Sequence, residues 1–388
     1  MLELGTWGLI LDDHRQVMDV EDDFYFTDAI TDRALGYIES AVSSTQPFFI
    51  YLAHAAPHWP LHAPPEDIER YAQTYHAGWD AIRTARHEEL NALGVLERTW
   101  DISARDLDVA AWNHVKLKSW EASKMAAYAA MVDCMDQSVG RVVSKLEELG
   151  QLDDTLILFL SDNGGCAEFM AEDGWAKFYP NRTLDGRPIT MGNVENLPPG
   201  DPQTFQSYDK PWANVSNAPF RLYKHYVHEG GISTPLIAHW PNGIASPSIS
   251  HEPCHVVDIA PTIYNITGAP YPSEFDGHGV QPLAGENLSA LFGDKPWQRA
   301  QPIYFEHEGN SAIRLGQWKL VREHDHPWEL YDMRKDRTEL NNLAEVYKDK
   351  TSELEALYRA WAARSGVQDW NELMPRLLEA WGLASTDG

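Results

Sequence analysis

The strongest hydrophobic signal in the chain is an unbroken apolar run that ends on polar residues. Thr155-Leu-Ile-Leu-Phe-Leu-Ser161 is followed at once by Asp162-Asn163-Gly164-Gly165. An apolar run without alternation predicts a strand buried on both faces, as in a parallel sheet. Ligands of open α/β sheets bind beyond the carboxyl ends of the strands. The oxygens of Asp162 and Asn163 suit a hard cation such as Ca²⁺ or Mg²⁺, but the same residues also form Asx-type turns that merely end a strand.

The segments before this run predict an α/β architecture. Helical spacing of apolar residues predicts one helix capped by Thr27 or Asp28, and a second over residues 120–149 that ends at the glycine after it. Residues 48–53 read as another buried strand, and the proline-rich loop that follows contains His58. A helix followed by a strand that ends on polar residues thus occurs twice, and this order is typical of α/β proteins.

The remaining N-terminal segments are less periodic. Residues 1–26 predict short strands around the polar turn Asp12-Asp13-His14. Residues 66–119 carry helical patches rich in acids, arginines and tryptophans, which indicates an insertion packed on the surface. Residues 166–220 are polar and rich in Gly, Pro and Asn, but their five aromatic residues favour an ordered lid over a disordered linker.

From about Trp297 the pattern changes to alternation, which predicts antiparallel strands. The alternating segments are 303–307, 312–315, 318–321 and 328–331. A final helix over about 345–364 would cover one face of their sheet. We therefore expect an α/β domain over 1–296 and a C-terminal subdomain of antiparallel sheet plus helix over 297–388, with a boundary near Pro296.

The charge balance argues against some classes of partner. With 31 basic against 58 acidic residues and a formal charge of −27, the chain is not expected to bind nucleic acid or an anionic membrane. A small anionic substrate is compatible with this charge, because a few local cations and a metal reverse the field within one pocket. No apolar run approaches the ~20 residues of a membrane helix, and the first residues show no signal-peptide pattern. The sequence leaves localisation and oligomeric state open.

Three segments at the ends of predicted strands carry candidate chemistry: the Asp162-Asn163 turn, the His58 loop, and the Lys224 to His228 segment that leads to a strand predicted over 235–240. Taken singly, His58 fits a structural role better than a catalytic one, and Lys224 fits an ordinary surface lysine. His225 and His228 fit either a site or a structural role, and the other histidines of the His58 loop read as structural. The candidates are Asp162, Asn163, His58, Lys224 and His228.

In their order along the chain, these motifs resemble those of the sulfatase family, and specifically bacterial-type arylsulfatases. The N-terminal matches are Pro47-Phe-Phe-Ile-Tyr-Leu-Ala with Ala-Pro57-His58-Trp-Pro-Leu, then Leu158-Phe-Leu-Ser-Asp162-Asn163-Gly164. The later ones are Tyr223-Lys224, His228-Glu-Gly-Gly-Ile232 and Pro235, then Trp318-Lys-Leu, Glu329-Leu-Tyr-Asp332, Asp336 and Glu339-Leu-Asn-Asn342-Leu. Together they span about residues 22–345.

The resemblance implies an alkaline-phosphatase-like fold, a mixed sheet flanked by helices, that binds Ca²⁺ or Mg²⁺ and hydrolyses small-molecule sulfate esters. It implies that Asp162 and Asn163 are metal ligands. His58 would protonate the leaving group or contact the sulfate, Lys224 would lie on the leaving-group side, and His228 is a further substrate-binding candidate. These roles suit sulfuryl transfer, because positioned cations and an acid stabilise the charge that develops on the departing oxygen.

One element of the family is missing from the sequence. The family's nucleophile is a formylglycine made from Cys or Ser in a C/S-x-P/A-x-R motif, and no Cys or Ser here has Pro or Ala at +2 and Arg at +4. The strand with the family's first two metal-binding aspartates is also absent. Asp12-Asp13 imitates that pair but leaves no room for a nucleophile helix before Asp28. The sequence therefore resembles a sulfatase that lacks its N-terminal part, and we expect this chain alone to be inactive.

Two alternatives remain open at this stage. A phosphate or phosphonate monoester hydrolase of the same superfamily would use similar metal and cation geometry. A non-catalytic, sulfatase-derived binding protein would need no nucleophile.

Overall fold

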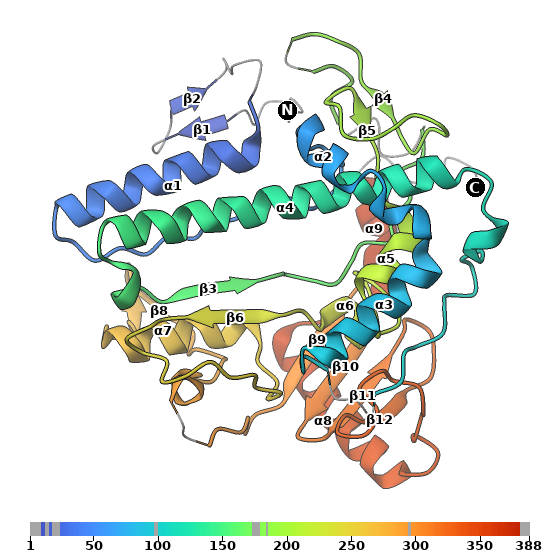
Figure 1. The fold of residues 1–388 in the computed structure, drawn as a ribbon. Helices are drawn as coiled ribbons and strands as arrows, with labels where there is room; N and C mark the ends of the chain where they lie inside the picture. The colour runs from blue at the N-terminus through green and yellow to red at the C-terminus, as the bar shows by residue number, and fades with distance from the viewer. Residues whose placement is uncertain are drawn as a thin grey trace. The chain divides into compact units, whose positions relative to one another are not determined.

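A computed structural model describes residues 9–11, 15–17, 24–96, 100–172, 179–183, 185–293 and 296–380. The chain forms two compact units, each built from several stretches of sequence. The first unit comprises Met1–Glu88, Ala104–Thr155 and Gly165–Ala218, and the second comprises Glu89–Ser103, Leu156–Gly164 and Pro219–Gly388. This division differs from the predicted boundary near Pro296, which falls inside the second unit. The α/β class is confirmed, and the helices and strands of each unit can be followed in Figure 1.

Two long helices, α1 (Phe26–Ser43) and α4 (Lys118–Glu148), lie side by side in the first unit (Figure 1). The predicted helix over 120–149 is therefore confirmed. Gly150 follows the C-cap and has a φ of +66°, a conformation that glycine adopts without strain.

The predicted cap of α1 is wrong. The helix begins at Phe26, after an extended Tyr25 that makes no side-chain cap. Thr27 is instead buried inside the first turn, where its carbonyl oxygen accepts a hydrogen bond from Thr31 Oγ1 at 2.6 Å. Thr31 also bonds Ser138 of α4, with 2.5 Å between the hydroxyl oxygens, so the first turn of α1 packs against α4.

The other elements of the first unit pack around α4. The hairpin of β1 and β2 confirms the predicted N-terminal strands, although its turn, Asp12-Asp13-His14, lies outside the described residues. Tryptophans of the 66–119 segment, Trp79 and Trp112, contact the fully buried Trp212 of α5 edge-on. The bounds are β1 Leu9–Leu11, β2 Arg15–Val17, α2 Pro65–Tyr71, α3 Trp79–Ala92 (which ends in the second unit), β4 Thr190–Met191, β5 Thr204–Phe205 and α5 Asp209–Ser216, with short 3₁₀ turns at Thr74–Ala77, Trp112–His114 and Leu152–Asp154.

The predicted buried strand over 48–53 is wrong. No strand is assigned there, and Phe49 and Tyr51 are 76% and 83% exposed. An apolar run forms a strand only where a neighbour offers hydrogen-bonding groups, and none of the described strands pairs with this segment.

In the second unit, β3 (Ile157–Leu160) pairs with β6 (Leu236–His239), so the strand predicted from the apolar run before Asp162 is confirmed. The pair is antiparallel, and every residue of β3 is only partly buried. The expectation of a strand buried in a parallel sheet is therefore wrong. The apolar run encodes the strand itself, but the direction of its neighbour depends on the path of the long segment between them.

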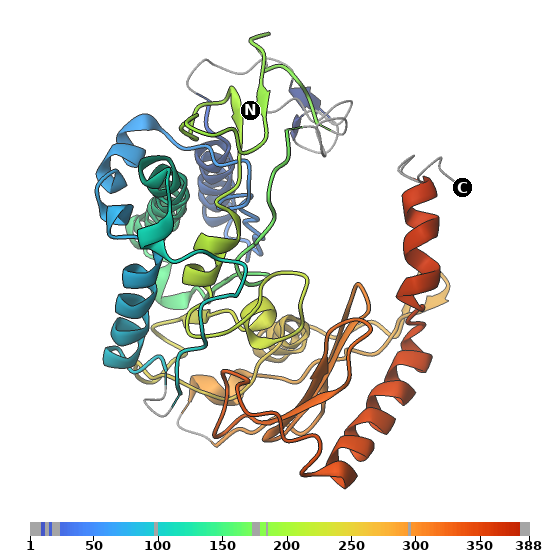
Figure 2. The same ribbon diagram turned by 90° about the vertical axis from the view of Figure 1, so that its right-hand side faces the viewer.

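The predicted C-terminal antiparallel sheet is confirmed, in the order β12-β11-β10-β9. Figure 2 shows α8 beside this sheet. One face of the sheet packs on α8 through Ile313, Leu320 and Leu330. The other face, which includes Val321 and Tyr331, packs on Val227. The bounds are β9 Ile303–His307, β10 Asn310–Leu315, β11 Trp318–Arg322, β12 Glu329–Asp332 and α8 Lys348–Ser365.

The remaining elements of the second unit are short, apart from α7 and α9. They are α6 Glu229–Ile232, α7 Ile259–Thr267, β7 Glu274–Phe275, β8 His278–Gly279 and α9 Trp370–Ala380, with 3₁₀ turns at Val256–Asp258 and Ser289–Phe292. Among the described residues, no helix is both long and apolar enough to span a bilayer.

Candidate active site

The polar turn after β3 is held by a residue just before β6. Thr234 Oγ1 donates a hydrogen bond to the carbonyl oxygen of Ser161 at 2.8 Å. Asp162 is exposed at the strand end, and its Oδ1 accepts the backbone N–H of Asn163 at 2.9 Å. The amide nitrogen of Asn163 donates to the carbonyl oxygen of Gly164 at 2.9 Å. The amide oxygen is therefore the side-chain atom of Asn163 that would coordinate a cation.

Gly164 joins this turn directly to the segment that contains Lys224 and His228. Its N–H donates to the carbonyl oxygen of Gly231 at 2.9 Å. A Cβ at position 164 would lie 1.8 Å from the carbonyl oxygen of Gly230, far inside van der Waals contact, so only glycine fits. The structure therefore brings Asp162 and Asn163 together with the lysine motif, two stretches that are far apart in the sequence.

Lys224 is half-buried, and it lies in a loop in which nearby side chains are buried in the protein. Tyr223 and Val227 are almost fully buried. The loop closes on itself, because the N–H of Tyr226 donates to Tyr223 and that of Gly230 donates to Arg221, at 3.0 and 3.1 Å. Backbone hydrogen bonds and buried neighbouring side chains thus hold the lysine loop in place.

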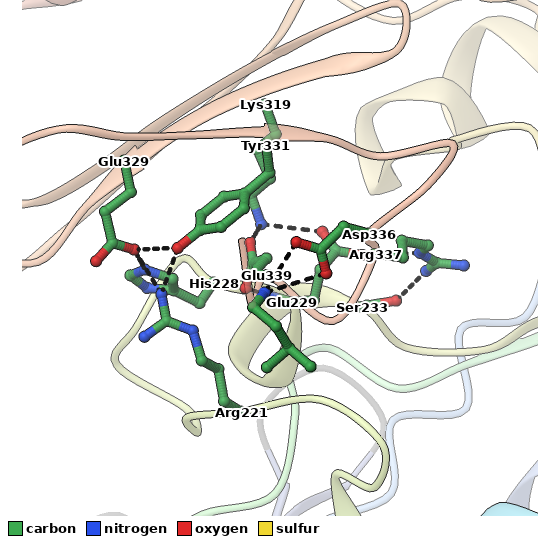
Figure 3. Close-up of polar contacts among 11 residues, drawn as sticks. Arg221, His228, Glu229, Ser233, Lys319, Glu329, Tyr331, Asp336, Arg337 and Glu339 are labelled. Atoms are coloured by element: carbon green, nitrogen blue, oxygen red, sulfur yellow. Dashed lines mark hydrogen bonds and ion pairs between the residues drawn. The ribbon is translucent and has the colours of Figure 1, made fainter. Parts of the chain in front are cut away.

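A buried ionic network fixes the end of this loop, as Figure 3 shows. The carboxylate of Glu229 lies 2.9 Å from both Lys319 Nζ and Arg337 Nε. Glu339 pairs with the same Lys319 at 2.7 Å and accepts the backbone N–H of Glu229 at 2.9 Å. Burial raises the pKa of Glu229, but the charges of Lys319 and Arg337 lower it more strongly, to well below its ordinary value.

His228 belongs to a second, adjacent network around Glu329 (Figure 3). Its Nε2 lies 3.1 Å from Glu329 Oε2, and a carboxylate only accepts, so the imidazole donates. Arg221 and Tyr331 bond the same oxygen at 2.5 and 2.9 Å. The His228 side chain is fully buried. Its contacts here are structural, and its predicted contact with substrate stays a prediction.

His58 lies in the first unit, whereas the other predicted site residues lie in the second. Its side chain is exposed, and its Nδ1 lies 2.7 Å from the carbonyl oxygen of Trp59. The indole N–H of Trp59 donates to Glu168 at 2.5 Å, and the ring packs against Tyr179 and Phe205. Described residues of the 166–220 segment, among them Tyr179 and Phe205, therefore pack against the His58 loop, as expected of an ordered segment.

Sequence reasoning missed the residues that hold the site in place. Lys319, Glu329 and Glu339 were quoted only as parts of a motif, without a role. A signal was present, because Lys319 and Val321 share one face of β11 and Val321 packs in the core. A lysine at an inward position of a predicted strand requires a buried partner.

Two family models match this chain. The model described as Sulfatase matches residues 6–269, and that of the N-sulphoglucosamine sulphohydrolase C-terminal region matches 220–360. The chain belongs to the sulfatase family.

Among curated relatives, an uncharacterized sulfatase of Schizosaccharomyces pombe is 33% identical over 376 residues, 92% of this chain and 64% of that protein. An arylsulfatase of Klebsiella aerogenes is 31% identical over 277 residues, 71% of this chain and 57% of that protein. The sulfatase-family chain described here thus spans less than two thirds of the length of either relative.

Solved structures show the same fold. Ps i-CgsB in complex with k-i-k-neocarrahexaose has a TM-score of 0.58 at 23% identity, covering 89% of this chain and 56% of that one. The phosphonate monoester hydrolase SpPMH from Silicibacter pomeroyi has a TM-score of 0.51 at 20% identity, covering 88% and 60%. At these identities the likeness concerns the sulfatase fold alone.

Proposed function

We propose that this chain supplies the metal-side and leaving-group-side residues of a sulfate-ester hydrolase acting on small-molecule sulfate esters. The observation that carries the proposal is the joint at Gly164, which packs the Asp162-Asn163 turn on the Lys224 loop within one compact unit. Family membership supports the reaction class.

Asp162 and Asn163 fit a Ca²⁺ or Mg²⁺ ion by chemistry, because both carry oxygen ligands on one hydrogen-bonded turn. Such an ion would polarise the oxygens of a bound sulfate. Two protein ligands are few for an ion that takes ~6–8 oxygens, so we expect weak binding by this chain.

Lys224 would place its ammonium group beside the oxygen that departs with the leaving group, where negative charge develops. His58 would give that oxygen a proton. The role of His58 rests on the resemblance of its loop to the family motif alone. The fixed loop around Lys224 matters because a positioned charge needs no reorganisation when the S–O bond breaks.

Calorimetric titration with Ca²⁺ tests the metal side of the proposal. The 388-residue chain should bind Ca²⁺ weakly, and Asp162→Ala should abolish that binding. Asp153→Ala removes an exposed carboxylate in a 3₁₀ turn and serves as the matched control, which should bind like wild type. If Asp162→Ala binds Ca²⁺ like wild type, the assignment of this turn is wrong.

A turnover assay tests the chemistry. Without a Cys or Ser in the nucleophile motif, the chain alone should not hydrolyse p-nitrophenyl sulfate above background. Robust turnover that one substitution within 1–388 abolishes would reveal a different nucleophile and contradict the proposal.

The phosphonate monoester hydrolase is a second candidate function, favoured by the structural likeness to SpPMH. Binding of p-nitrophenyl sulfate and of a phenylphosphonate monoester, each measured with wild type and with Lys224→Ala, separates the two. We expect the sulfate ester to bind more tightly, and its affinity to fall in the variant. A preference for the phosphonate would favour the second function. Binding that Lys224→Ala leaves unchanged would contradict both assignments of the lysine.

A further inference from the structure

Two histidines and a glutamate gather at the first hairpin of the C-terminal sheet. His225, His307 and Glu308 each offer one ligand atom, and these atoms lie within 4.8 Å of one another. His225 Nδ1 lies 2.9 Å from Glu308 Oε2, and the two imidazole rings meet edge-on with centroids 5.5 Å apart. His225 and Glu308 are 83 positions apart in the sequence, and the fold brings them into contact.

The hairpin between β9 and β10 presents Glu308 at its tip. His307 pairs with Asn310, so Glu308 and Gly309 form a two-residue turn, with φ of +52° and +81°. Turns with two positive φ values favour Asn-Gly or Asp-Gly. A glutamate at the first position is strained, and turn chemistry does not explain it.

Asn310 links the backbones of the two histidines. Its side-chain amide donates to the carbonyl oxygens of both His225 and His307, each at 3.0 Å. His225 itself has a φ of +85°, which an unrestrained histidine rarely adopts. The backbones of both histidines are therefore held in place before any ligand binds.

Two imidazoles and one carboxylate form a ligand set that suits Zn²⁺, with further positions left for water. Tetrahedral ligands about 2.1 Å from zinc lie roughly 3.4 Å apart, so closing the cluster needs only small side-chain rotations. The side chains of His225 and Glu308 are 35% and 41% exposed, which leaves them room to rotate and gives an ion access.

We propose that His225, His307 and Glu308 bind Zn²⁺ or a similar borderline transition-metal cation, with Asn310 as the positioning residue. The site shares no residue with the proposed oxygen site at Asp162 and does not depend on the proposed function. A cation held there places additional positive charge one residue from Lys224.

Titration of the metal-free 388-residue chain with Zn²⁺, in excess Ca²⁺ to occupy oxygen sites, tests this proposal. We expect one Zn²⁺ per chain, and an affinity at least about tenfold lower in His225→Ala, His307→Ala and Glu308→Gln. Asn310→Ala should weaken binding to a smaller extent. Co²⁺ provides a second readout, because its visible spectrum reports imidazole and carboxylate ligation directly.

Glu308→Asn separates loss of the ligand from loss of the fold. Asparagine suits the turn but is too short to reach the ion, so this variant should melt no lower than wild type and still lose Zn²⁺. His278→Ala removes an exposed histidine of β8 and should bind Zn²⁺ like wild type, as should Asp162→Ala. Wild-type affinity in His307→Ala and Glu308→Asn, or an equal loss in His278→Ala, would overturn the proposal and leave a simple His–Glu ion pair.

Discussion

The ammonium group of Lys319 is fully buried between two carboxylates, Glu229 at 2.9 Å and Glu339 at 2.7 Å. Lys319→Met keeps the length of the side chain and leaves both carboxylates without this partner. Because an unpaired buried charge is costly, we expect the free energy of unfolding to fall by about 3–5 kcal/mol. Urea unfolding of wild type and Lys319→Met measures this difference in the free energy of unfolding.

The control for this substitution is Lys335→Met. That side chain is 83% exposed and lies 3.8 Å from Asp332, so its loss should change the free energy of unfolding by at most about 0.5 kcal/mol. Equal effects of the two substitutions would show that the buried network contributes no more than a surface pair.

Glu329 makes the second network sensitive to acid. Burial raises the pKa of Glu329, but the hydrogen bond from His228 and the charge of Arg221 lower it more strongly, from 4.5 to about 2. A pKa lower in the folded than in the unfolded chain means that the carboxylate stabilises the fold above about pH 4.5, and that this contribution is lost as the pH falls toward 2.

Melting temperatures across that window test the linkage. Wild type should lose stability more steeply than Glu329→Gln between about pH 4.5 and about pH 2, because the variant has no carboxylate to protonate. Glu345→Gln, at a side chain that is 90% exposed, should keep the wild-type slope. A Glu329→Gln slope equal to wild type would place the acid sensitivity elsewhere.

At the scale of elements, the joint between the end of β3 and the start of α6 decides the candidate site. Gly164→Ala would place a methyl group 1.8 Å from the carbonyl oxygen of Gly230, so one backbone must move. We expect a loss of about 1–3 kcal/mol in the free energy of unfolding, together with loss of the weak Ca²⁺ binding, because Asp162 moves with the turn.

Gly140→Ala is the matched control for this substitution. Gly140 lies inside α4, where an added Cβ meets nothing within 4 Å. Alanine should stabilise the helix there by about 0.5–1 kcal/mol. Chemical unfolding and calorimetry of both variants check the two expectations. A Gly164→Ala protein with wild-type stability and Ca²⁺ affinity would be incompatible with the joint described above.

At the scale of the whole molecule, charge and exposed apolar surface act in opposite directions. The formal charge of −27 keeps copies apart, whereas Phe49, Tyr51 and Ile237 are 76%, 83% and 57% exposed. Salt screens the repulsion beyond about 10 Å at 0.1 M but leaves the apolar attraction. We therefore expect self-association to increase with salt, measured by sedimentation velocity.

Ile237→Lys tests which surface is responsible. A lysine on β6 discourages edge-to-edge pairing, so this variant should associate less than wild type at the same salt concentration. A sedimenting mass that does not change with salt concentration would contradict the proposed opposition of charge repulsion and apolar attraction.

The sequence alone determined most element types and the order of the motifs. The periodicity of residues 120–149 encoded α4, alternation encoded β9 to β12, and the Asp-Asn-Gly-Gly stretch encoded the turn after β3. These signals are local, because the spacing of apolar residues reflects the repeat of one helix or strand.

Only the tertiary structure decided which distant segments meet. The antiparallel pairing of β3, the exposure of residues 48–53 and the burial of His228 depend on where the intervening chain runs. The partners of buried charges also depend on the tertiary structure. The buried Lys319 requires a carboxylate partner, but its own segment does not indicate that Glu229 is that partner. The His225, His307 and Glu308 cluster arises in the same way, from a loop and a hairpin that the sequence separates and the fold brings into contact.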